Sequence, residues 1–120
     1  MSELHLEDDC LFCKIIQKKI PGTVVYEDEH ALAFEDISPQ APIHLLIIPK
    51  RHIARLADLQ TGDETLMAHL FSVVRKLAET KGLRDSGFRT VINSGERAGQ
   101  SVFHLHLHLM GGRVFQWPPG

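Results

Sequence analysis

Three histidines, His104, His106 and His108, alternate with leucines near the end of the chain. Alternate side chains of a strand share a face, so the three imidazoles should project from one surface at steps of about 6.6–6.8 Å. Zinc–nitrogen bonds of about 2.0–2.1 Å hold ligand nitrogens only about 3.5 Å apart, so three successive same-face positions converge poorly on one ion. One or two of them could still bind a catalytic metal, which leaves a metal-dependent hydrolase open. Alternatively, a neutral central imidazole attacks phosphorus and forms a covalent intermediate that water hydrolyses.

The segments that must position these histidines follow from hydrophobic periodicity and turn residues. The almost continuously apolar segment Ile43–Ile48 predicts a strand buried on both faces, within which His44 requires a reason. Strands joined directly to strands predict an antiparallel sheet in an α+β fold. The five predicted strands are Thr23–Glu27, Ala31–Asp36, Ile43–Ile48, Phe88–Ser94 and Phe103–Met110.

Two helices are predicted beside the sheet, a short one over Leu11–Lys18 and a long one over about 63–81. Thr61 and Glu64 have capping-box spacing, and Gly82 supplies a C-terminal stop. An apolar stripe at helical period lies between Glu64 and Gly82. Its members are Leu66, Leu70, Val73, Val74 and Leu77.

Length and composition predict one globular domain over residues 1–120, with an irregular segment over 1–9 and a C-terminal tail over 111–120. Apolar residues make up 43% and charged residues 23%, close to globular averages. The net charge of −2 gives no general attraction to nucleic acid. Apolar runs too short for a bilayer and an acidic N-terminus favour a cytoplasmic protein without a membrane partner.

Two further segments contain residues capable of chemistry. Cys10 and Cys13 are the only cysteines, and their spacing is typical of half a metal site or a redox pair in a reducing compartment. The polar segment 95–101 precedes the histidines and includes Gly99, which would let backbone N–H groups approach an anion. It lacks the Gly-Lys-Ser/Thr ending of a P-loop and leads into a strand, which disfavours a Walker-type NTPase.

The run His104-Leu105-His106-Leu107-His108-Leu109-Met110 resembles the His-φ-His-φ-His-φ-φ signature of the histidine-triad (HIT) superfamily. Asp36-Ile37-Ser38-Pro39-Gln40-Ala41-Pro42, Gly99-Gln100-Ser101-Val102 and the ending Trp117-Pro118-Pro119-Gly120 resemble its HINT branch, the histidine-triad nucleotide-binding proteins. The resemblance covers about residues 10–120. It implies a five-stranded antiparallel sheet with one long and one short helix, and a homodimer whose sheets join into ten strands.

For the catalytic residues, the resemblance implies that His106 is the nucleophile of a purine nucleoside phosphoramidase that needs no cofactor for catalysis. It implies that His108 and His44 surround the α-phosphate and balance its charge. The backbone carbonyl of His104 would hold the other ring nitrogen of the nucleophile. Ser101 would contact the phosphate and the leaving group.

For the purine nucleotide, the expected pocket combines apolar side chains with one carboxylate. Phe34 and Asp36 share a face of their predicted strand, which places an aromatic surface beside a possible acceptor for both ribose hydroxyls. The resemblance adds the remaining contacts. The full predicted set is Phe12, Ile15, Ile20, Phe34, Asp36, Ile37, Asn93, Gly99, Gln100, Ser101, His106 and His108.

Members of the superfamily with this cysteine pair complete a Cys₂His₂ zinc site, which here would use Cys10, Cys13, His52 and His104. Zinc at this position would be structural. Two alternatives to a phosphoramidase stay open at this point. One is a dinucleoside polyphosphate hydrolase, and the other is a nucleotide-binding interaction module whose hydrolysis is incidental.

Overall fold

The computed structural model describes residues 6–120, and residues 1–5 of the predicted irregular segment lie outside that range. Over residues 6–120 the chain forms one antiparallel sheet of five strands, in the order β1-β2-β3-β5-β4, with two α-helices. This confirms the α+β prediction with one long and one short helix. The elements are α1 (Leu11–Ile16), β1 (Val24–Glu27), β2 (Ala31–Glu35), β3 (Ile43–Pro49), η1 (Leu56–Asp58), α2 (Glu64–Thr80), β4 (Phe88–Val91), η2 (Glu96–Ala98) and β5 (Leu107–Gly111).

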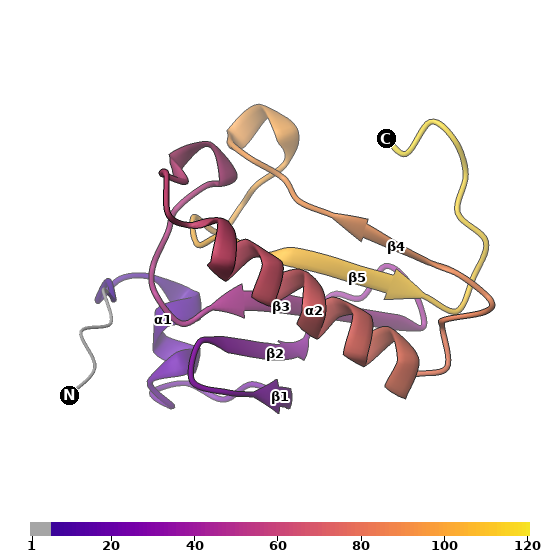
Figure 1. Cartoon of the computed structure of the whole chain (residues 1–120), viewed down its shortest axis with the longest axis horizontal. Helices are drawn as coiled ribbons and strands as arrows, with labels where there is room; N and C mark the ends of the chain where they lie inside the picture. The colour runs from indigo at the N-terminus through magenta and orange to yellow at the C-terminus, as the bar shows by residue number, and fades with distance from the viewer. Residues whose placement is uncertain (1–5) are drawn as a thin grey trace.

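The two faces of the sheet carry different cores. Helix α2 crosses one face, in front of β3 and β5 in Figure 1, and packs on an apolar cluster that includes Leu105, Leu107 and Leu109. Helix α1 covers part of the other face, where Phe12 packs in a second cluster. Strand β3 contributes to both clusters, as its continuous apolar sequence predicts.

The start of α2 differs from the prediction. Its N-cap is Asp63 and not Thr61, although Glu64 still accepts a hydrogen bond from the backbone N–H of Gly62 at 2.8 Å. The Asp63 carboxylate is occupied by the backbone N–H of Gln60 at 2.9 Å, so it does not cap the helix itself. The C-terminal end agrees with the prediction, because Gly82 follows with φ +73°. Within residues 6–120, no helix combines the length and the apolar character needed to cross a membrane.

Strand β5 begins at Leu107, four residues later than predicted, so of the three histidines only His108 lies within it. The register pairs Ile47 with Leu107, which would set Pro49 opposite Leu105. Proline has no N–H to donate, and the N–H of Leu105 bonds the carbonyl of Ile53 instead, at 2.6 Å. The prediction of one regular strand through all three histidines is therefore wrong.

Four other ends fall inside their predicted bounds, while β3 and β5 each extend one residue beyond theirs, to Pro49 and Gly111. Strand β4 stops at Val91, short of the predicted Ser94, because its antiparallel partner β5 does not begin until Leu107. Helix α1 ends at Ile16 and not at Lys18, which has φ +63°. Strand β1 starts at Val24 and β2 stops at Glu35, each one residue inside its predicted bound.

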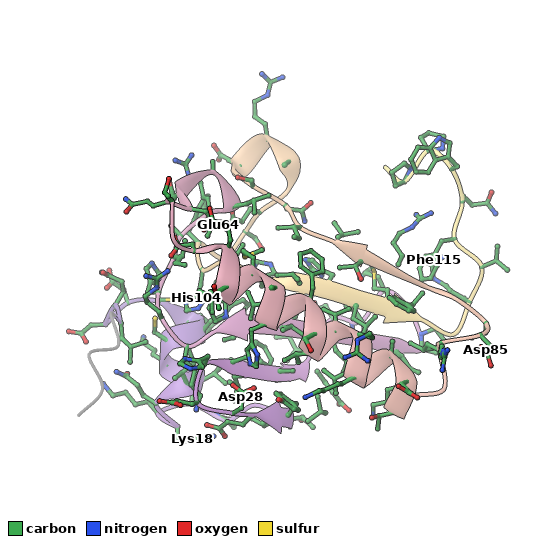
Figure 2. All side chains as sticks on the ribbon, in the orientation of Figure 1. Lys18, Asp28, Glu64, Asp85, His104 and Phe115 are labelled. Atoms are coloured by element: carbon green, nitrogen blue, oxygen red, sulfur yellow. The ribbon has the colours of Figure 1, made fainter. Side chains whose placement is uncertain are left out.

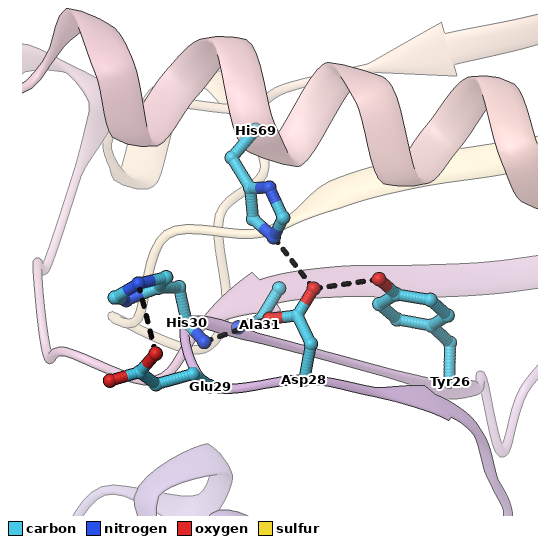
Figure 3. Close-up of polar contacts among 6 residues, drawn as sticks. All are labelled: Tyr26, Asp28, Glu29, His30, Ala31 and His69. Carbon is cyan, nitrogen blue, oxygen red and sulfur yellow. Dashed lines mark hydrogen bonds and ion pairs between the residues drawn. The ribbon is translucent and has the colours of Figure 1, made fainter.

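One carboxylate joins the β1–β2 turn to the long helix (Figure 3). Asp28 accepts the backbone N–H groups of His30 and Ala31 on Oδ1, both at 2.8 Å. Its Oδ2 accepts the hydroxyl of Tyr26 at 2.7 Å and Nε2 of His69, from α2, at 2.6 Å. Burial alone would raise the pKa of Asp28, but these hydrogen bonds favour the charged form and lower it to about 2.

Candidate functional site

Strands β3 and β5 bring two histidines together on the α1 face of the sheet. Leu46 pairs with His108 and His44 pairs with Met110, so the two imidazoles are diagonal neighbours. His44 Nε2 lies 2.9 Å from His108 Nδ1 and 3.5 Å from Asp36 Oδ2. Burial lowers the pKa of both imidazoles, and for His108, beside His106 and His44, it falls to about 4. Both are therefore neutral near pH 7.

His106 is held in one orientation. Its Nδ1 lies 2.7 Å from the backbone carbonyl oxygen of His104, and because a carbonyl only accepts, Nδ1 carries the proton. The lone pair is then on Nε2. The residue is 7% exposed, and its ring is nearly perpendicular to that of Phe12, with centroids 5.2 Å apart. Burial lowers its pKa, despite the opposing effects of the His104 carbonyl and Asp36.

A cavity of about 630 Å³ opens in front of these histidines. Its walls come from α1, β2, β3, the segments 36–40 and 99–102, and the histidine segment. Ten of the predicted nucleotide-contacting residues border it: Phe12, Ile15, Ile20, Phe34, Asp36, Ile37, Gly99, Ser101, His106 and His108. Its lining therefore combines aromatic and aliphatic side chains with two of the imidazoles of the histidine segment and one carboxylate.

Two residues of the predicted pocket set, Asn93 and Gln100, do not border this cavity. The Gln100 side chain is buried and holds the loop instead. It donates to the carbonyls of Ala54 at 2.7 Å and Val102 at 3.1 Å, and accepts the backbone N–H of Gly95 at 2.8 Å. These bonds support the loop in which Gly99, with φ +97°, and Ser101 reach the cavity.

Sequence reasoning missed two hydrogen bonds donated by backbone N–H groups of the segment 36–42. The backbone N–H of Gln40 donates to His44 Nδ1 at 2.9 Å. The N–H of Ser38 donates to Asp36 Oδ1 at 2.8 Å, which directs that carboxylate beside the cavity. Both donors are backbone groups, so residue types gave no signal. Asp36 itself follows β2 and is not within it.

The two cysteines meet two histidines at the N-terminal end of α1. Cys10 Sγ lies 3.4 Å from His104 Nδ1, and Cys13 Sγ lies 3.4 Å from His52 Nδ1. One potential ligand atom from each of these four residues lies within 4.8 Å of all the others. Burial raises the pKa of the Cys13 thiol to about 11 and lowers that of His104 to about 4.

The donor set fits a structural zinc ion. Two sulfurs and two imidazole nitrogens are its preferred ligands, and a bound cation would favour the thiolate that burial alone disfavours. The other ring nitrogen of His104 lies 2.8 Å from the carbonyl of Pro49, the kind of contact that orients metal-binding imidazoles. In Figure 2 the His104 ring lies beside α1.

Known proteins share this fold. Residues 17–115 match the family model of the HIT domain. An uncharacterized HIT-like protein from Synechococcus elongatus is 49% identical over 115 residues, which cover 96% of this chain and 100% of that protein. A solved HIT family hydrolase from Legionella pneumophila is 54% identical with a TM-score of 0.92, over 93% of this chain and 100% of that one.

A histidine triad nucleotide-binding protein from Candida albicans is also similar, at 34% identity and a TM-score of 0.80, over 92% of this chain and 83% of that one. The matches in sequence and in structure thus extend over nearly the whole chain. They agree with the alternating histidines and with the sheet that supports them. This chain belongs to the HIT family.

Proposed function

We propose that this chain hydrolyses purine nucleoside 5′-phosphoramidates, with His106 as the nucleophile. One observation carries the proposal: the His104 carbonyl accepts a hydrogen bond from Nδ1 of His106, which leaves the lone pair on Nε2 of a ring that borders the cavity. A buried, neutral and oriented imidazole is suited to attack phosphorus.

The cavity favours a nucleotide over a simple phosphate ester. Phe12 and Phe34 stand edge to face, with centroids 5.2 Å apart, and provide an apolar wall for a flat base. Ile37, which is 95% exposed at the rim, would become covered by that base. The Asp36 carboxylate borders the same cavity, with Oδ2 3.5 Å from His44 Nε2, and would accept hydrogen bonds from the hydroxyls of a ribose that joins the base to the phosphate.

The proposed reaction has two displacements. First, the bond from His106 Nε2 to the α-phosphorus forms as the phosphorus–nitrogen bond of the substrate breaks, and the departing amine gains a proton from water through the Ser101 hydroxyl. Second, water attacks phosphorus, the bond to His106 breaks, a proton returns to solvent and the nucleoside monophosphate leaves. His108 and His44 would face the phosphate oxygens on which charge develops.

The comparisons support a nucleotide hydrolase. The Legionella pneumophila protein is named a hydrolase and the Candida albicans protein a nucleotide-binding protein. The phosphoramidate is the finer part of the proposal, and it follows from the HINT-like segments of the sequence. A dinucleoside polyphosphate is the competing substrate.

Substitution of the nucleophile tests the reaction. His106→Asn should lower kcat for adenosine 5′-phosphoramidate by more than about 10³-fold, because the covalent route is lost. Affinity for AMP, measured by calorimetry, should change little. His30→Asn, in the exposed β1–β2 turn, is the matched control. Unchanged turnover in His106→Asn would refute the assignment of the nucleophile. If the unmodified protein cleaves diadenosine polyphosphate faster than adenosine 5′-phosphoramidate, the dinucleoside polyphosphate is the better assignment of the substrate.

We also propose that Cys10, Cys13, His52 and His104 hold a structural Zn²⁺ ion. Metal analysis should give one zinc per chain, and Cys13→Ser should lose it. Zinc present at 100 times its dissociation constant stabilises a fold by about 2.7 kcal/mol, so chelation should lower the thermal midpoint. Chelated protein that stays folded should keep its turnover. Loss of turnover in chelated, folded protein would instead indicate a metal-dependent hydrolase.

A homodimer through the β4 edge is the third proposal. Strand β4 is an edge of the sheet with regular pairing to β5, and its Phe88 is 41% exposed. The opposite edge, β1, contains an irregularity between Val24 and Tyr26, which discourages pairing. Sedimentation should show dimers that Phe88→Arg weakens and that Val24→Arg, on the other edge, leaves intact. A monomer at micromolar concentration would refute the proposal.

A further inference from the structure

A chain of hydrogen bonds runs from the backbone at residue 40 to the ring of His108. It begins with the N–H of Gln40, which lies 2.9 Å from His44 Nδ1. A backbone N–H only donates, so His44 Nδ1 must present its lone pair. In neutral His44 the proton is then on Nε2.

The hydrogen bond between His44 and His108 then determines the tautomer of His108. His44 Nε2 lies 2.9 Å from His108 Nδ1. Because His44 Nε2 carries the proton, His108 Nδ1 must accept, and the proton of neutral His108 is then on its Nε2. Asp36 Oδ2, at 3.5 Å from His44 Nε2, also favours a proton on that nitrogen. The two imidazoles thus have the same tautomer, with both N–H groups pointing away from residue 40.

The chain ends at a donor without an acceptor. His108 Nε2 is buried, and residues 6–120 offer it no hydrogen-bond partner. An unmet buried donor costs about 1–3 kcal/mol in general, so proteins retain few of them. The His108 ring borders the cavity beside His106, with ring centroids 5.0 Å apart. An anionic oxygen on a phosphorus attacked by His106 is the acceptor that this N–H fits.

Gln40, whose N–H begins the chain of hydrogen bonds, is held in place by two further hydrogen bonds. Arg113 Nε donates to the Gln40 carbonyl at 2.9 Å, and the Gln40 side chain donates to the Ser38 carbonyl at 2.9 Å. The Arg113 guanidinium lies 4.2 Å from the centroid of the Phe115 ring, which Figure 2 labels on the C-terminal segment. Residue 40 is therefore fixed by a segment more than seventy residues away in sequence.

We propose that Gln40 is a positioning residue, whose backbone N–H sets, through His44, which nitrogen of His108 presents a proton to the phosphate. This inference rests on the proposed function and gives Gln40 the role of determining the tautomer in which His108 acts as a donor. With the opposite tautomer, His108 Nε2 would present a lone pair to an anionic oxygen and repel it. Arg113 supports the same role by anchoring the carbonyl of residue 40.

Two variants isolate the backbone N–H. Gln40→Ala and Gln40→Pro both remove the side-chain amide, but only the proline variant removes the N–H. We expect kcat for adenosine 5′-phosphoramidate to be on the order of 10- to 100-fold lower in Gln40→Pro than in Gln40→Ala, below the ~10²–10³-fold cost of losing a whole oxyanion donor. KM should differ by less than about threefold, because the apolar wall of the cavity is unchanged. Equal kcat in the two variants would overturn the proposal.

Histidine ¹⁵N spectra test the tautomers without any turnover. In the unmodified protein His44 and His108 should both show a protonated Nε2 and an unprotonated Nδ1, and Gln40→Pro should show a mixture of forms. A protonated Nδ1 on His44 of the unmodified protein would overturn the proposal, even if Gln40→Pro failed to fold. If instead the tautomers are as stated and no phosphoramidate is cleaved, the proposed function fails and the tautomer chain stands.

Discussion

Replacement of Asp28 by asparagine should destabilise the fold, because the charged carboxylate accepts four hydrogen bonds in the folded chain. The pKa of this carboxyl falls from its ordinary 3.8 to about 2 in the folded chain. At about 1.36 kcal/mol for each pH unit, this difference of about 1.8 corresponds to an upper limit of about 2.4 kcal/mol. The side chain is 26% exposed, and asparagine can still accept from some of its partners, so we expect about 1–2 kcal/mol.

The pH dependence has a definite sign. A carboxyl whose pKa is lower in the folded state stabilises the fold above its unfolded pKa of 3.8, and this stabilisation is lost as the pH falls through about 2. The difference in the free energy of unfolding between the unmodified protein and Asp28→Asn should therefore be at its maximum at pH 7. It should shrink between about pH 4 and pH 2, because protonation makes Asp28 resemble the uncharged amide.

Urea unfolding at a series of pH values measures this difference. With a slope of about 2 kcal/mol per molar, the midpoint of Asp28→Asn should lie roughly 0.5–1 M lower at pH 7. Asp85→Asn, which removes an exposed carboxylate from the turn after α2, is the matched control and should leave the midpoint nearly unchanged. A difference for Asp28→Asn that stays constant from pH 7 to pH 2.5 would show that its charge is not what stabilises the turn.

Three substitutions elsewhere test the packing. Gly111→Ala would place its Cβ 2.5 Å from Cδ1 of buried Leu83, and we expect a loss of about 1–3 kcal/mol by urea unfolding. Leu107→Ala opens a cavity beneath α2 and should cost about 2–5 kcal/mol in the same assay. Phe12→Leu keeps apolar volume but removes an aromatic ring from the wall proposed to contact the base, so AMP affinity by calorimetry should fall a few-fold, in line with about 0.5–1.5 kcal/mol for an aromatic pair. Unchanged values would refute each in turn.

Local sequence patterns predicted which side chains of an element face the apolar core. The apolar stripe along α2 and the alternation of leucine with histidine both indicate the buried face. Leu105, Leu107 and Leu109 do pack under α2, while the Phe12 ring contacts His104 and His106 on the other face. Burial therefore determined the alternation even where no strand forms. This is why the facing of the histidines could be predicted and the start of β5 could not.

The missed features depend either on a partner that is distant in sequence or on hydrogen bonds that residue types do not specify. Strand β5 starts late because Pro49, on β3, offers no N–H where Leu105 would pair. Thr61 does not cap α2, because the helix begins at Glu64 and places Asp63 at the N-cap position, where its side chain makes no capping hydrogen bond. The contact from Gln40 to His44 uses a backbone group, which every residue except proline possesses. Spacing within one segment contains none of this information.

His104 differs from the other two histidines because its ring and its backbone belong to different sites. Its Nδ1 faces the cysteine sulfurs, its Nε2 meets the Pro49 carbonyl, and its own carbonyl accepts from His106. A regular strand would commit that carbonyl to a neighbouring strand or direct it away from the side chain two residues on. The early end of the β3–β5 ladder frees it for His106. The break in the strand is therefore what allows one residue to orient the proposed nucleophile, His106, while its ring lies in the cysteine cluster.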